Sequence, residues 1–145
     1  MNWITRFFKL PLRDKLLLIE AIYYLTRWQL IVKISPFNWY KSFLGNLIDH
    51  PTGTNASQFE HNKRIKKAIH SASKYLPWKP VCFPQALTGK SMLKRRGIKT
   101  TFYLGAAVGN FSTKVIDLHS WLKCGDQTIA GGVISHQFTV FRIYE

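Results

Sequence analysis

Apolar positions recur at helical spacing near the start of the chain and predict a long helix over residues 15–34. Glu20, Arg27 and Lys33 interrupt the apolar run, whereas a membrane span needs about 20 apolar residues with few charges. Glu20 also splits the apolar core that a signal peptide requires, and no small-residue cleavage site follows. The pattern therefore predicts a packed amphipathic helix that ends before Pro36.

A second helix is predicted after a turn-rich linker at residues 49–56. Ser57-Gln58-Phe59-Glu60 has the capping-box sequence, in which the serine accepts from the first turn and the glutamate reaches back to the cap. Pro77 ends this helix. Its buried stripe is predicted at Ile65, Ile69, Ala72 and Leu76.

From Ile98 onward the period changes from helical to extended. Residues 100–108 are rich in β-branched and aromatic side chains and predict a strand, and Gly109-Asn110 predicts a turn. Further strands are predicted at about 114–124, 128–130 and 138–144. Helices followed by an antiparallel meander predict an α+β fold.

A proline-framed cysteine stands between the helical and the extended parts of the chain. Pro80 and Pro84 stiffen the backbone around Cys82, and proline suits a first helical turn. Cys82 is therefore predicted at a helix N-terminus, where free N–H groups and the positive dipole end favour thiolate over thiol. This helix is predicted to end at Lys94-Arg95-Arg96-Gly97, with cations at its negative end and a glycine beyond them.

Composition narrows the class of protein. The 145 residues have room for one domain, with an N-terminal helical part over about 1–50 and a core over about 57–145. A hydrophobic fraction of 46% excludes a disordered chain, and two cysteines favour a reducing, cytoplasmic setting over a disulfide scaffold. The net charge of +14 predicts attraction to something acidic, which can be nucleic acid, a membrane surface or a peptide.

His119 is the candidate partner of Cys82. A cysteine at a helix start that faces a histidine on a strand is the arrangement of a thiol nucleophile and its base. Taken alone, each residue also has an ordinary structural role, as a buried hydrophobe or a hydrogen-bonded strand residue. A zinc site that adds Cys124 and His136 is disfavoured, because no pair has Cys-x-x-Cys or His-x-x-x-His spacing.

Three motifs resemble one known family. Cys-Phe-Pro-Gln-Ala at 82–86, Arg-Arg-Gly-Ile at 95–98 and His-Ser-Trp-Leu at 119–122 are similar to the transglutaminase-like leader-peptidase subunit of lasso-peptide biosynthesis. Leu-Pro-Trp-Lys-Pro at 76–80 and the region 15–45 extend the resemblance over nearly the whole chain. It implies N-terminal helices before a transglutaminase-like, papain-like core, with the nucleophile helix packed on a small antiparallel sheet.

The resemblance also implies an activity and partners. The protein would be a cysteine peptidase that removes the leader from a ribosomally made precursor, upstream of a separate asparagine-synthetase-like lasso cyclase. The chain has no room for the leader-recognition domain of fused members, so it resembles the split form, which works with a separate leader-binding protein. By this resemblance Cys82 is the nucleophile and His119 the base, and no cofactor is expected.

The third catalytic residue departs from the family pattern. Many members carry an aspartate about twelve residues after the histidine, where this chain has no carboxylate between 129 and 133. Asp117 shares the strand face of His119, roughly 6–7 Å along the strand, and Asp126 lies in a turn. We predict Asp117 as the third residue, with a backbone carbonyl as the alternative.

Two other classes of function compete with the peptidase. A non-catalytic scaffold would bind peptide in the same cleft, and a basic nucleic-acid-binding module would explain the charge but not the proline-framed cysteine. Contact of the basic, aromatic-rich N-terminal region with a membrane surface is the less favoured alternative. The cations of Lys63–Lys67 and Lys94–Arg96 are expected to attract an acidic partner and to take no part in the chemistry.

Overall fold

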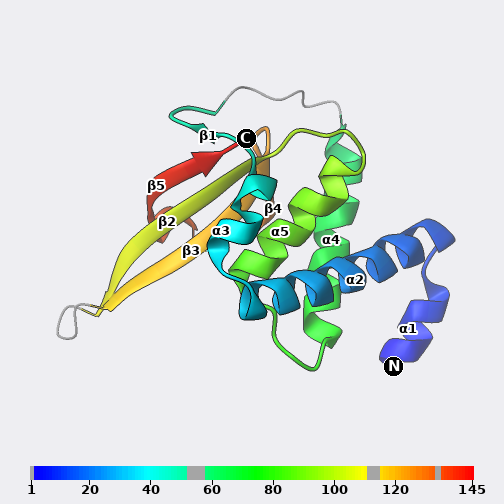
Figure 1. Cartoon of the computed structure of the whole chain (residues 1–145). Helices are drawn as coiled ribbons and strands as arrows, with labels where there is room; N and C mark the ends of the chain where they lie inside the picture. Colours follow the sequence, from blue (N-terminus) through cyan, green and yellow to red (C-terminus); the bar gives the residue numbers. More distant parts are fainter. Residues whose placement is uncertain (1, 52–57, 111–114, 133–134) are drawn as a thin grey trace.

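The computed structural model describes residues 2–51, 58–110, 115–132 and 135–145 (Figure 1). The helices are α1 (Trp3–Lys9), α2 (Leu12–Ile34), α3 (Phe37–Tyr40), the 3-10 turn η1 (Lys41–Leu44), α4 (Phe59–Tyr75), α5 (Cys82–Lys94) and the 3-10 turn η3 (Ser135–Gln137). The strands are β1 (Leu47–Ile48), β2 (Thr101–Asn110), β3 (Val115–Cys124), β4 (Gln127–Ala130) and β5 (Thr139–Tyr144). This mixture of helices and antiparallel strands confirms the predicted α+β class.

The strands form one antiparallel sheet in the order β1-β5-β2-β3-β4. β2, β3 and β4 follow one another as predicted, but β5 pairs with β2 instead of β4, and β1 extends the sheet beyond β5. The predicted antiparallel meander is therefore wrong for its last strand, β5. The predicted turn at Gly109-Asn110 is also wrong, because both residues belong to β2 and Asn110 pairs with Val115.

The molecule is layered around α5 (Figure 1). One side of α5 packs on β3 and β4, and α2 crosses α4 and α5. Gly89 allows the close approach of α5 to the sheet, since a Cβ there would lie 2.8 Å from Leu122 Cδ2 and 3.2 Å from Ile129 Cγ2. The predicted packing of the helix that begins at Cys82 on an antiparallel sheet is confirmed.

The helix limits follow local signals closely. α5 ends at Lys94 and Gly97 has a φ of +69°, as the predicted terminus requires. α4 begins at Phe59; Ser57 of the predicted capping box lies outside the described residues, and Gln58 makes no side-chain capping hydrogen bond. In the described part of the chain, every helix is too short or too polar to cross a membrane.

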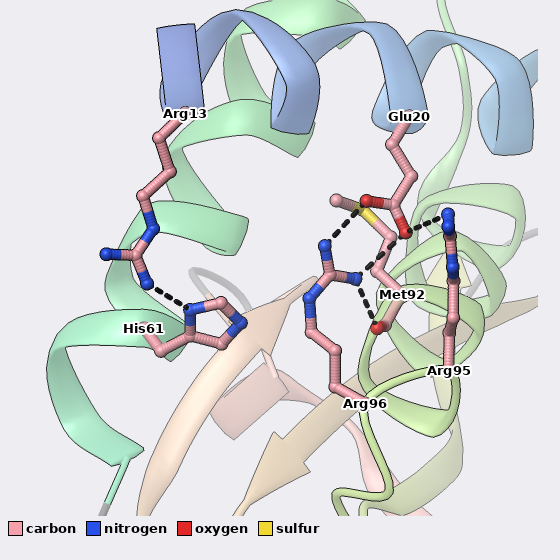
Figure 2. A network of polar contacts seen from close by, with 6 residues as sticks. All are labelled: Arg13, Glu20, His61, Met92, Arg95 and Arg96. Atoms are coloured by element: carbon pink, nitrogen blue, oxygen red, sulfur yellow. Dashed lines mark hydrogen bonds and ion pairs between the residues drawn. The ribbon is translucent and has the colours of Figure 1, made fainter. Parts of the chain in front are cut away.

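A polar network joins α2 to the end of α5 (Figure 2). The guanidinium of Arg96 donates to both carboxylate oxygens of Glu20, at 2.9 and 2.7 Å, and to the carbonyl of Met92 at 2.7 Å. Arg95 lies 3.5 Å from the same carboxylate, whose side chain is only 10% exposed. The charge that interrupts the apolar pattern of α2 is therefore matched by a cation from the turn that follows α5. The hydrogen bond to Glu20 raises the pKa of Arg96.

Candidate active site

Cys82 is the first residue of α5 and is half-buried, so its predicted position at a helix start is confirmed. The preceding Val81 is extended, and the Gln85 side chain donates to the Pro80 carbonyl at 2.7 Å. The first backbone N–H groups of a helix lack partners within it, and in α5 these are the N–H groups of Cys82 and Phe83, since Pro84 has none. This end of α5 can accept developing negative charge.

Aromatic packing fixes the start of α5. Phe83 lies beside Phe37 and Tyr40, with ring centroids 6.5 and 6.1 Å away, and meets Phe102 of β2 edge-to-face at 5.6 Å. Such contacts contribute beyond the burial of area alone. The residue next to Cys82 is therefore held by both the N-terminal helices and the sheet.

His119 lies in the middle of β3 and is 7% exposed. Its ring stacks against Trp121 and Phe138, with centroids 5.7 and 4.9 Å away. Its Nε2 lies 2.5 Å from the carbonyl oxygen of Gly131. Because a carbonyl only accepts, Nε2 carries the proton and donates, which leaves Nδ1 of the neutral ring as the basic nitrogen.

Gly131 stands twelve residues after His119, where the resembling family often has its aspartate. Its φ is +74°, and an added Cβ would overlap the carbonyl oxygen of Ser120, so the position requires glycine. The predicted third residue Asp117 is exposed and has no contact with His119 among the described interactions, and Asp126 is exposed in the β3–β4 turn. The geometry favours the backbone-carbonyl alternative.

His119 and the helix that carries Cys82 lie on opposite faces of the sheet. Strand alternation puts His119 on the face of Tyr103 and Trp121, whose rings stack at 5.4 Å, whereas α5 packs on the opposite face through Leu122. The structure brings His119 together with Gly131 and two aromatic rings. The structure does not bring His119 together with Cys82, and a hydrogen bond between them is absent from the interactions of the described residues.

The sequence reasoning missed the partners of this imidazole. Gly131 and Phe138 were not singled out, although the twelve-residue spacing pointed at the first of them. Cys124 is 6% exposed and belongs to the core, and both cysteines are free thiols. Of the two cysteines, only Cys82 is partly exposed.

Comparison with known proteins supports this architecture. Residues 40–142 match the Transglutaminase-like superfamily, and this stretch contains α4, α5 and most of the sheet. No curated protein and no solved structure matches the chain. Because the family match covers more than half of the sequence and includes both Cys82 and His119, the chain belongs to the transglutaminase-like superfamily.

Proposed function

We propose that the protein is a cysteine peptidase that removes the leader from a lasso-peptide precursor. Membership of the superfamily supports thiol chemistry in general. The narrower reaction rests on the resemblance of the motifs around Cys82, Arg95 and His119 to split leader peptidases. The observation that carries the proposal is the His119 ring, which donates through Nε2 to Gly131 and keeps Nδ1 as a base.

The proposed reaction requires Cys82 and His119 to come together when substrate is bound, because α5 and the imidazole lie on opposite faces of the sheet in this structure. Nδ1 of His119 then accepts the proton of the Cys82 thiol. The sulfur attacks the carbonyl carbon of the scissile amide, and the N–H groups at the start of α5 stabilise the oxyanion. The imidazolium then protonates the leaving amine, and a thioester to the leader remains. Water, deprotonated by His119, cleaves the thioester to a carboxylic acid and restores the thiol.

Gly131 acts on the imidazole in this scheme. Its carbonyl holds the ring in one tautomer and stabilises the imidazolium through a hydrogen bond to a charged donor. Trp121 and Phe138 restrict the rotation of the ring. A full carboxylate is therefore dispensable for orientation, although it would stabilise the imidazolium more strongly.

The proposal includes a separate leader-binding protein and a separate lasso cyclase as partners. The exposed cations Lys63, Arg64, Lys66 and Lys67 on α4 support electrostatic attraction to an acidic partner. Arg96 has a different role from the one expected of it, because its charge is matched by Glu20 inside the fold.

The test is cleavage of precursor peptide by the full chain with its leader-binding protein, followed by mass spectrometry. We expect Cys82→Ala to lower the cleavage rate by at least about 1,000-fold while the protein stays folded. Cys124→Ala is the matched control, since it removes a thiol from the core, and it should cleave at nearly the normal rate. Normal cleavage by the Cys82→Ala protein would exclude the peptidase mechanism.

The second candidate function is a peptide-binding scaffold without turnover. The absence of a Cys82–His119 hydrogen bond among the described interactions is the observation that favours it. In that case the wild-type protein would bind precursor with its leader-binding protein present but would release it uncut. Fluorescence anisotropy with labelled precursor, read beside the cleavage assay, separates the two functions.

A further inference from the structure

Helix α2 is apolar on two opposite sides. One side, with Leu17, Ala21 and Leu25, is buried against the rest of the fold. The other side carries six large apolar residues that are each more than half exposed and that we call the outer stripe: Leu12, Leu16, Ile19, Tyr23, Leu30 and Ile34. At about 100° per residue they fall within an arc of roughly 60°, diametrically opposite the buried side.

The outer stripe runs the whole length of α2, with one gap between Tyr23 and Leu30. From Leu12 to Ile34 it follows α2 for roughly 33 Å at about 1.5 Å per residue. Figure 1 shows that α2 crosses α4 and α5, so the side of α2 opposite to them faces outward. Isolated exposed apolar residues need no explanation, but an aligned row of this length marks an interaction surface.

Cations border the outer stripe on both sides. On the same helical wheel, Arg13 and Arg27 lie along one border, and Lys15 and Lys33 lie along the other. The two acidic residues of α2 are engaged within the fold, because Asp14 lies 3.8 Å from Arg64 and Glu20 pairs with Arg96. The charge that the stripe presents is therefore positive.

Helix α1 extends this surface. Phe8 is 70% exposed, and the ammonium of Lys15 lies 5.9 Å from the centre of its ring. This contact places an aromatic side chain at the Lys15 border of the outer stripe. Ile4, on the same short helix, is 48% exposed.

We propose that the outer stripe docks on an anionic lipid surface, with α2 lying parallel to the bilayer plane. An apolar face bordered by Lys and Arg, with an aromatic residue such as Tyr23 among its members, is the pattern of an interfacial helix. Acidic lipid headgroups complement both borders and the net charge of +14. Docking in this orientation leaves α5 and the sheet on the side away from the lipid.

Charge argues against a second copy of the chain as the occupant. Two copies that met through their outer stripes would bring the bordering cations of one chain toward those of the other, whichever way the two helices run. Both chains carry +14, so the contact would add repulsion to the burial of apolar area. A lipid surface avoids this repulsion. The proposal is independent of the peptidase activity.

The test is co-sedimentation of the full chain with vesicles. We expect binding to phosphatidylcholine mixed with phosphatidylglycerol, much weaker binding to phosphatidylcholine alone, and weakening as salt shortens the Debye length from about 10 Å to about 3 Å. Leu16→Glu combined with Ile19→Glu should lower the partition coefficient by about 100-fold, roughly tenfold for each change. Leu47→Glu is the matched control, since Leu47 is 63% exposed on β1, and it should bind like the wild type.

Circular dichroism of each variant shows whether the fold is retained, and both substituted α2 side chains are exposed. Failure of the wild type to bind anionic vesicles would overturn the proposal. Equal binding by the folded Leu16→Glu/Ile19→Glu protein would also overturn it, because charge elsewhere would then account for the binding. A dimer in gel filtration that this variant dissociates, without vesicle binding by the wild type, would assign the stripe to a second copy instead.

Discussion

Lys90 is a buried cation whose removal should stabilise the protein. It lies in the middle of α5, is 6% exposed and borders a cavity of about 470 Å³ together with Lys94 and Glu145. Loss of hydration lowers the pKa of Lys90 from 10.5 to about 8; the positive charge of Lys94 lowers it further, whereas Glu145 opposes the change. The folded protein therefore holds this proton less tightly than the unfolded chain does.

The sign of the effect follows from proton binding. Between pH 8 and pH 10.5 the unfolded chain binds more protons at this site, so stability rises with pH over that window. Below pH 8 Lys90 is protonated in both the folded and the unfolded state, so the full free-energy cost of burying its charge is present. The difference between the two pKa values corresponds to an upper limit of about 3 kcal/mol. Because water in the cavity screens part of the charge, we expect about 1–2 kcal/mol.

Lys90→Met keeps the length and the helical preference of the side chain and removes its charge. Urea unfolding followed by tryptophan fluorescence should show a variant about 1–2 kcal/mol more stable than wild type at pH 7, with the difference narrowing toward pH 10. Lys66→Met, at an exposed position on α4, is the control and should change little. The assignment of a desolvated ammonium would be refuted if Lys90→Met were no more stable than the wild type at pH 7. It would also be refuted if the variant were stabilised equally at pH 7 and pH 10.

Two further predictions concern the ion pair and the glycine. Arg96→Ala should lower the free energy of unfolding by about 3 kcal/mol, because it leaves the nearly buried Glu20 carboxylate without its closest donors; urea unfolding measures it, and a loss below about 1 kcal/mol would contradict it. Gly131→Ala should reduce both stability and precursor cleavage, because its Cβ meets the Ser120 carbonyl. Gly97→Ala, with a similar φ of +69° but open space around the Cβ, should cost only about 1 kcal/mol, and equal losses at both glycines would show that φ alone matters.

The sequence by itself determined most of the local structure. The proline-framed start of α5 at Cys82, its end before Gly97 and the strand that carries His119 were all predictable. These features depend on interactions between residues close in the chain, such as missing N–H partners, a positive φ or alternating burial. The superfamily match agrees with these predictions from local sequence.

Only the tertiary structure decided features that depend on pairing between distant segments. β5 joins β2 rather than β4, because strand partners are chosen by non-local contacts that a period of two does not specify. The acceptor for His119 is a carbonyl, a group that every residue has, so no side chain in the sequence could identify Gly131.

The sequence also could not determine which apolar side of α2 is buried. The apolar run with interspersed charges predicts a packed amphipathic helix that Glu20 interrupts. In the fold, Glu20 lies against Arg96, while Leu16 and Ile19 stay in water. Which of two apolar sides becomes buried is determined by the helices that pack against it, and their positions are set by the whole fold.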